Sequence, residues 1–145
     1  MLTATCEYAL RALVQLARLP KESSILGRDL ARQARIPKNY LVKILVSLRN
    51  VGMVEAVRGR GGGYRLSKPP DQILLIEVFE VFEGIRSRPG CLLGENAECC
   101  DEHACSAHAA WREAIDSYLR FLTTKTIADI ATPAAQPLVP LATTS

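Results

Sequence analysis

The chain has 145 residues, of which 48% are hydrophobic and 23% are charged, with a formal net charge of +3. These values are typical of one globular domain and exclude a disordered chain and a large multidomain enzyme. The uncharged stretch 131–145 lacks the length and continuous hydrophobicity of a membrane span, and Glu7 and Arg11 interrupt the apolar core that a secretory signal needs. We therefore expect a cytoplasmic protein without a membrane segment.

The charge is divided between two parts of the chain. Residues 28–68 carry ten basic side chains against two acids, whereas residues 71–116 carry ten acids against three bases. This change of sign at Pro69 and Pro70 predicts a nucleic-acid-binding front part and a separate rear part, although solvated faces are the alternative. The predicted units are a DNA-binding domain over 1–68, a cofactor loop with dimerisation helices over 69–131, and a disordered tail over 132–145.

In the front part, apolar side chains recur at helical spacing. They predict helices over residues 6–19, 27–34 and 37–51. Pro37 suits the first position of the third helix, and Gly52 suits its end. Two short strands, 53–57 and 64–67, follow on either side of a glycine-rich tip. Helix, helix, turn, helix and hairpin is the order of a winged helix-turn-helix.

The rear part begins with residues 73–82, which are apolar nearly all round and predict a buried helix ended by Gly84. Residues 86–104 lack periodicity and predict a loop. A long amphipathic helix follows over 106–122, and because its apolar face needs a partner, we expect a homodimer. Thr126 to Asp129 resembles a capping box. The predicted fold class is mainly α with a small β-hairpin wing and a long C-terminal dimerisation helix.

The third helix and the hairpin tip carry the predicted DNA contacts. A helix that enters the major groove needs a polar, cationic outer face, and its first turns reach the base edges. At the tip, glycines let the backbone approach a phosphate strand while arginines reach it. The predicted contacts are Lys38, Asn39, Tyr40, Lys43, Arg49, Arg58 and Arg60, with Arg65 next to the tip. A dinucleotide-binding loop is the rival, but Tyr64 replaces its last glycine and a strand follows instead of a helix.

Cysteines gather in the rear part. Four of the five lie within fifteen residues, which in a reducing compartment indicates metal or redox chemistry rather than disulfides. Cys91, Cys99 and Cys105 are separated by seven and five residues, and these long, unequal gaps favour an iron-sulfur cluster over zinc. The candidates for a fourth ligand are His108, Glu7 and His103. Cys100 is a bystander or a substitute ligand, because adjacent side chains diverge.

Other readings of these cysteines are a metal-free thiol switch, in which Cys99, Cys100 or Cys105 is oxidised, and a zinc-stabilised DNA-binding protein. An enzyme with Cys105 as nucleophile and His108 as base is disfavoured, because the sequence offers no orienting third group and no oxyanion site. A protein-interaction adaptor is disfavoured by the basic helix and wing.

The segment from Val57 to Leu66, with the pattern Val-Arg-Gly-x-Gly-Gly-Gly-Tyr-Arg-Leu, and the cysteine series followed by Trp111 resemble the Rrf-type family of bacterial winged-helix regulators. The resemblance implies a homodimeric transcription factor, usually a repressor, on a palindromic operator of double-stranded DNA. It also implies an iron-sulfur cluster in the cysteine loop. We favour [2Fe-2S] over [4Fe-4S] for this chain and expect it to sense redox state, nitric oxide or iron-sulfur status. The ligands it implies are Cys91, Cys99 and Cys105, with His108 or Glu7 as the fourth.

Overall fold

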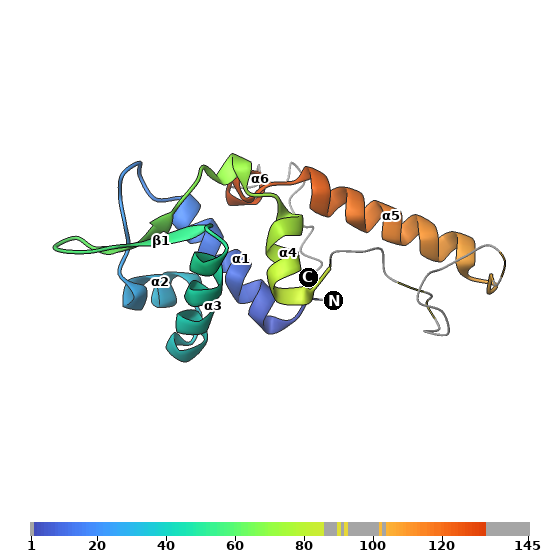
Figure 1. Ribbon diagram of the computed structural model, residues 1–145, viewed down its shortest axis with the longest axis horizontal. Helices are drawn as coiled ribbons and strands as arrows, with labels where there is room; N and C mark the ends of the chain where they lie inside the picture. Colours follow the sequence, from blue (N-terminus) through green and yellow to red (C-terminus); the bar gives the residue numbers. More distant parts are fainter. Residues whose placement is uncertain (1, 86–89, 91, 93–101, 103, 133–145) are drawn as a thin grey trace, which may run out of the picture.

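The computed structural model describes residues 2–85, 90, 92, 102 and 104–132. Its elements in chain order are α1 (Ala4–Ala17), α2 (Gly27–Ala34), α3 (Lys38–Asn50), β1 (Val54–Val57), β2 (Gly63–Leu66), the 3-10 helix η1 (Pro70–Gln72), α4 (Leu75–Glu83), α5 (His108–Thr124) and α6 (Ile127–Ala131). Figure 1 shows the hairpin projecting from one end of a compact helical body and α5 projecting from the other end. The predicted class, mainly α with a hairpin wing, is confirmed.

Helix α1 forms the centre of the body and contacts α2, α3, α4 and α6. Its N-cap is Thr3, whose Oγ1 accepts a hydrogen bond from the Cys6 amide at 3.3 Å. Ala9 and Ala12 are fully buried on α1, and such small side chains let neighbouring helices approach closely. One continuous core therefore joins the basic front part to the helices of the rear part.

The turn between α2 and α3 is tight. Arg35 ends α2 in the left-handed conformation with φ of 56°, and Ile36 is buried behind it. Pro37, predicted as the first helical residue, is instead the N-cap of α3 in an extended conformation. The reason is that its carbonyl already accepts from the Leu41 amide, at 3.0 Å, while its own backbone stays non-helical.

The hairpin pairs β1 and β2 in antiparallel register, with Val54 opposite Leu66. A third segment joins it, because Ile25 and Tyr64 exchange two backbone hydrogen bonds of 3.0 and 2.8 Å. This close approach requires glycine at position 63, which has φ of +144° and no room for a Cβ atom. The wing is therefore fastened to the chain that enters α2.

The rear helices differ in detail from the prediction. Helix η1 was not predicted, and α4 is buried only along Leu75, Val78 and Phe79 rather than all round, because α1 and α5 cover one side of it. Gly84 ends α4 with φ of +69°, as predicted. None of the helices in the described residues is long and apolar enough to cross a membrane. The predicted tail, 132–145, lies outside the described residues except for its first residue.

The capping box predicted before α6 is present and makes stability depend on pH. The Asp129 carboxylate accepts hydrogen bonds from the Thr126 amide at 2.8 Å and hydroxyl at 3.0 Å, and they lower the pKa of Asp129. A carboxyl whose pKa is lower in the folded state stabilises the fold above its unfolded pKa, and this contribution is lost as the pH falls through the folded pKa. We expect D129N to unfold at lower urea concentration than wild type at about pH 7, and the difference to close on acidification. E113Q, on the exposed surface of α5, serves as the control; an equal, pH-independent loss in both variants would contradict the argument.

Candidate functional site

Helix α3 separates an apolar face from a polar one. Its buried face consists of Leu41, Ile44, Leu45 and Leu48. The opposite side carries the exposed side chains of Lys38, Asn39, Lys43 and Arg49, which we call the outer arc of α3. Four of the predicted DNA contacts therefore share one solvent-facing surface. This is the arrangement by which a recognition helix packs on its own domain while it reaches into a groove.

Tyr40, a fifth predicted contact, lies away from the outer arc. Its ring packs against that of Tyr8 in α1, with centroids 5.8 Å apart, and the Arg11 guanidinium lies 5.6 Å from the Tyr8 centroid. Tyr40 thus links the first turn of α3 to α1. Periodicity within α3 did not indicate this contact, because the partner ring comes from another helix.

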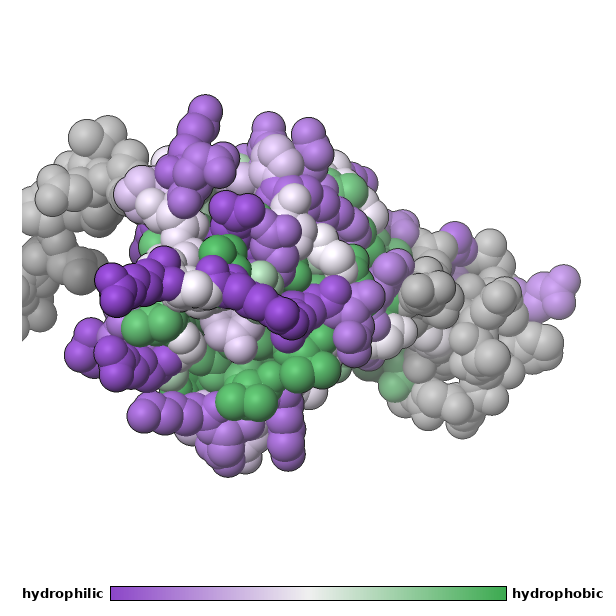
Figure 2. All heavy atoms as spheres, turned by 60° about the vertical axis from the view of Figure 1, so that its left-hand side comes forward, coloured by the Kyte–Doolittle hydropathy of each residue, from purple (hydrophilic) through white to green (hydrophobic). Residues whose placement is uncertain are grey.

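The wing lies beside the outer arc. An open groove of about 530 Å³ runs between Val46 and Arg49 of α3 and Ala56 of β1. At the tip of the hairpin, Arg58 and Arg60 are exposed among glycines. Figure 2, in which the wing end comes forward, shows hydrophilic side chains projecting around hydrophobic ones on this face. The exposed cations of the outer arc and of the wing tip therefore flank an open groove between α3 and β1.

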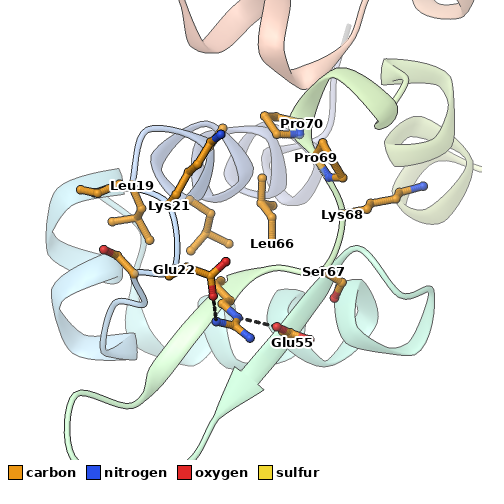
Figure 3. A pocket seen from close by; sticks show the side chains of 14 residues that line it. Leu19, Lys21, Glu22, Glu55, Leu66, Ser67, Lys68, Pro69 and Pro70 are labelled. Carbon is orange, nitrogen blue, oxygen red and sulfur yellow. Dashed lines mark hydrogen bonds and ion pairs between the residues drawn. The ribbon is translucent and has the colours of Figure 1, made fainter.

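Arg65 has a different environment from the other wing arginines. Its guanidinium pairs with Glu55 on the neighbouring strand and, at 3.6 Å, with Glu22 before α2 (Figure 3). The hydrogen bond with Glu55 raises the pKa of Arg65. The sequence placed Arg65 with the phosphate contacts, whereas in the structure its guanidinium is engaged by two carboxylates of the same chain. Because these groups are substantially exposed, solvent screens both pairs and their contribution to stability is small.

An open pocket of about 510 Å³ lies at the root of the wing (Figure 3). Leu19, Leu66 and the two prolines of the front–rear junction give it an aliphatic lining. Its rim is charged, but Arg65 is paired as described and Lys68 lies 3.1 Å from Glu77. These ion pairs hold the wing root against the rest of the body.

The second candidate centre is at the start of α5. The Cys105 carbonyl accepts from the His108 amide at 3.0 Å, so the two residues are one turn apart, with Cys105 half-buried and His108 buried. The Trp111 indole donates to the Gly90 carbonyl at 3.0 Å, which brings the residue before Cys91 to the first turn of α5. Thiolate and imidazole are ligands that iron-sulfur clusters and zinc accept, so this pair fits half of a four-ligand set.

Among the other predicted ligands, only Glu7 lies within the described residues. Cys91, Cys99, Cys100 and His103 lie outside the described residues. Glu7 is exposed on α1, whereas Cys105 lies at the far end of α5, a helix of 17 residues and hence about 25 Å (Figure 1). Within the described residues, no three His, Cys, Asp or Glu side chains form a group able to hold a metal ion.

Cys6, which the sequence set apart from the other cysteines, is a core residue. It is fully buried in α1, and burial together with the Glu83 and Glu7 carboxylates raises the pKa of its thiol to about 12. Glu83 also accepts from the Thr3 amide at 2.8 Å and hydroxyl at 2.7 Å, which joins the end of α4 to the start of α1. A thiol of such high pKa is protonated and inert at neutral pH.

A helix-turn-helix with a basic outer arc and a basic wing defines the class of this protein as a winged-helix DNA-binding transcriptional regulator. The family model described as "Iron-dependent Transcriptional regulator", Rrf2, matches residues 2–133. The chain belongs to the Rrf2 family, and it is a regulator and not an enzyme.

Individual relatives agree with this assignment. The chain is 36% identical over 129 residues to the HTH-type transcriptional regulator NsrR of Geobacillus kaustophilus, covering 89% of this chain and 88% of that protein. Its fold resembles CymR, described as the global cysteine regulator of B. subtilis, at a TM-score of 0.75 and 24% identity, over 90% of this chain and 95% of that one. It also resembles T. potens IscR at a TM-score of 0.66 and 22% identity, over 90% and 85% of the two chains.

Proposed function

We propose that this protein is a homodimeric repressor that binds a palindromic operator and senses redox state, nitric oxide or iron-sulfur status through a cluster at residues 91–108. Cys91, Cys99 and Cys105 would hold the cluster, of the [2Fe-2S] type, with His108 as fourth ligand. Glu7 remains an alternative only if the second subunit supplies it, because α5 separates it from Cys105 in one chain. Residues 1–68 would bind DNA, residues 69–131 would sense and dimerise, and the protein would act in the cytoplasm.

The observation that carries the cluster proposal is the Trp111 hydrogen bond to Gly90. It ties the chain that enters Cys91 to the helical turn that follows Cys105 and carries His108. This hydrogen bond would bring the ligands at both ends of the cysteine loop, Cys91 at one end and Cys105 and His108 at the other, close to one another. When bound, an iron-sulfur cluster would supply a redox-sensitive crosslink within this loop.

Dimerisation is supported by the surface of α5. Tyr118 and Phe121 leave 36% and 48% of their surfaces exposed on a helix that projects from the body (Figure 1). A second copy of α5 would cover these rings by a two-fold contact. The two half-sites of an operator are spaced by whole turns of the DNA helix. A shift of α5 would therefore change how well the DNA-binding domains of the two subunits fit one operator.

The test of sensing is the visible spectrum, with iron and sulfide content, of protein purified without oxygen. We expect a brown protein with equal amounts of iron and inorganic sulfide. A protein that stays colourless after attempted reconstitution would contradict the cluster. Oxidation of its Cys105 by peroxide, detected by mass spectrometry, would then favour the thiol switch, and bound zinc would favour a structural metal site.

The DNA-binding part of the proposal predicts how the tip arginines behave. Each phosphate contact releases counterions, so R58A and R60A should each weaken binding to all DNA sequences and reduce the slope of log affinity against log salt by about one. The measurement is fluorescence anisotropy over a salt series. R18A, in which the lost guanidinium bonds the Ala131 carbonyl at 3.0 Å, is the control with equal loss of charge. Slopes that fall equally in all three variants would mean that net charge, not wing contact, is responsible.

A further inference from the structure

The middle of the outer arc of α3 is occupied by valines. Val42 has 63% and Val46 has 49% of its surface exposed, on the most polar face of the helix. With about 100° of rotation per residue, Val42 lies between Lys38 and Lys43 around the helix, and Val46 lies one turn further along the same line. The cations thus lie at the sides of the arc, and Val42, Val46 and Asn39 lie between them.

Both valines border hollows that the folded chain leaves open. Val42 lines an apolar hollow of about 160 Å³ together with Leu45 and the Tyr64 ring, and Arg28 and Lys38 also line it. Val46 lines the groove between α3 and β1 described above. The described part of the chain leaves about half or more of each side chain uncovered, so this exposed part is available to a partner on the wing side of α3.

When a helix lies in the major groove, the sides of its outer arc meet the phosphate walls and its centre meets the base edges. A valine at the centre can neither donate nor accept a hydrogen bond. Among the groups that the base pairs present in the major groove, the C5 methyl of thymine is the apolar one. We propose that Val42 and Val46 select operator sequence by contacting thymine methyl groups. This inference rests on the proposed function, DNA binding through α3.

The test removes single methyl groups from DNA. The wild-type protein first selects a high-affinity duplex from a random pool, and each thymine of a half-site is then replaced by deoxyuridine, which lacks only the methyl. We expect the loss of the methyl at one or two positions to weaken wild-type binding about fourfold, the effect of one buried methyl-sized group. V42A and V46A should each abolish the preference for thymine over uracil at one of these positions. A double-mutant cycle that combines the valine substitution with the thymine-to-deoxyuridine substitution measures this effect.

Val51 provides a matched control. Val51 is also a valine and is 48% exposed, but it lies beyond the last residue of α3 and off the outer arc. V51A should therefore lose affinity at the same thymine-to-deoxyuridine positions as the wild-type protein. A selected site in which no methyl matters, or a methyl preference that survives in both V42A and V46A, would overturn the inference and leave DNA binding intact. Failure of the wild-type protein to bind any duplex would instead contradict the proposed function and this inference with it.

Discussion

Replacing Cys105 by alanine should reduce the iron and inorganic sulfide of the purified protein at least about tenfold, because the site loses a direct ligand and changes in outer-shell partners alone already cost tenfold or more. Cys105 is half-buried just before α5, so its removal should leave the helical fold intact. If the iron-sulfur cluster controls DNA binding, the operator affinity of C105A should also differ from that of cluster-containing wild-type protein. The expected difference is about 5- to 150-fold, the usual range of coupling between two sites. The measurements are elemental analysis, circular dichroism and anisotropy.

The matched control is C6A. Cys6 is a buried thiol whose pKa is raised to about 12, and it packs in the body rather than at the start of α5. C6A should lower the free energy of unfolding by about 1 kcal/mol through the small cavity it creates, yet keep its iron. Full iron content and unchanged DNA affinity in C105A would show that the cysteine series is not a sensor. Equal iron loss in both variants would show that stability rather than ligation was measured.

Gly63→Ala should strongly destabilise the wing. A Cβ atom at this position would lie 2.1 Å from the Ile25 carbonyl oxygen and 2.8 Å from the Leu26 amide nitrogen, and φ is +144°. Backbone atoms cannot move aside as a flexible side chain can, so the bridge between Ile25 and Tyr64 must open. We expect a loss of about 3 kcal/mol in urea unfolding, from the combined clash and backbone strain. DNA affinity should fall about tenfold or more, because the wing would no longer be held beside α3.

Gly61→Ala separates backbone strain from the clash. Gly61 also has a positive φ, +71°, but a Cβ atom there would meet nothing within 4 Å. We expect a loss of about 1 kcal/mol, the usual cost of alanine in the left-handed region. If G63A proved no worse than G61A, the wing would not depend on its close approach to Ile25.

The local elements and the types of chemistry could be predicted from the amino-acid sequence alone. Helical spacing located α2 and α3 within a residue or two of their observed limits, since a buried stripe such as Leu41, Ile44 and Leu48 is encoded over consecutive turns. Gly84 and the capping box at Thr126 marked helix ends, because caps act over three or four residues. The glycine-rich tip and the basic stretch indicated DNA binding for the same reason: their residues are neighbours in the chain.

The contacts between side chains of different elements, by contrast, became visible only in the folded chain. It paired Arg65 with Glu22 and Glu55, packed Tyr40 on Tyr8, and placed Glu7 on α1 in the body while Cys105 precedes the distal start of α5. No periodicity encodes such pairs, because each depends on how separate helices and strands pack around the common core. The valines of α3 are a further example: their apolar character is visible in the sequence, but only the packing of the described body shows that Val42 and Val46 stay 63% and 49% exposed.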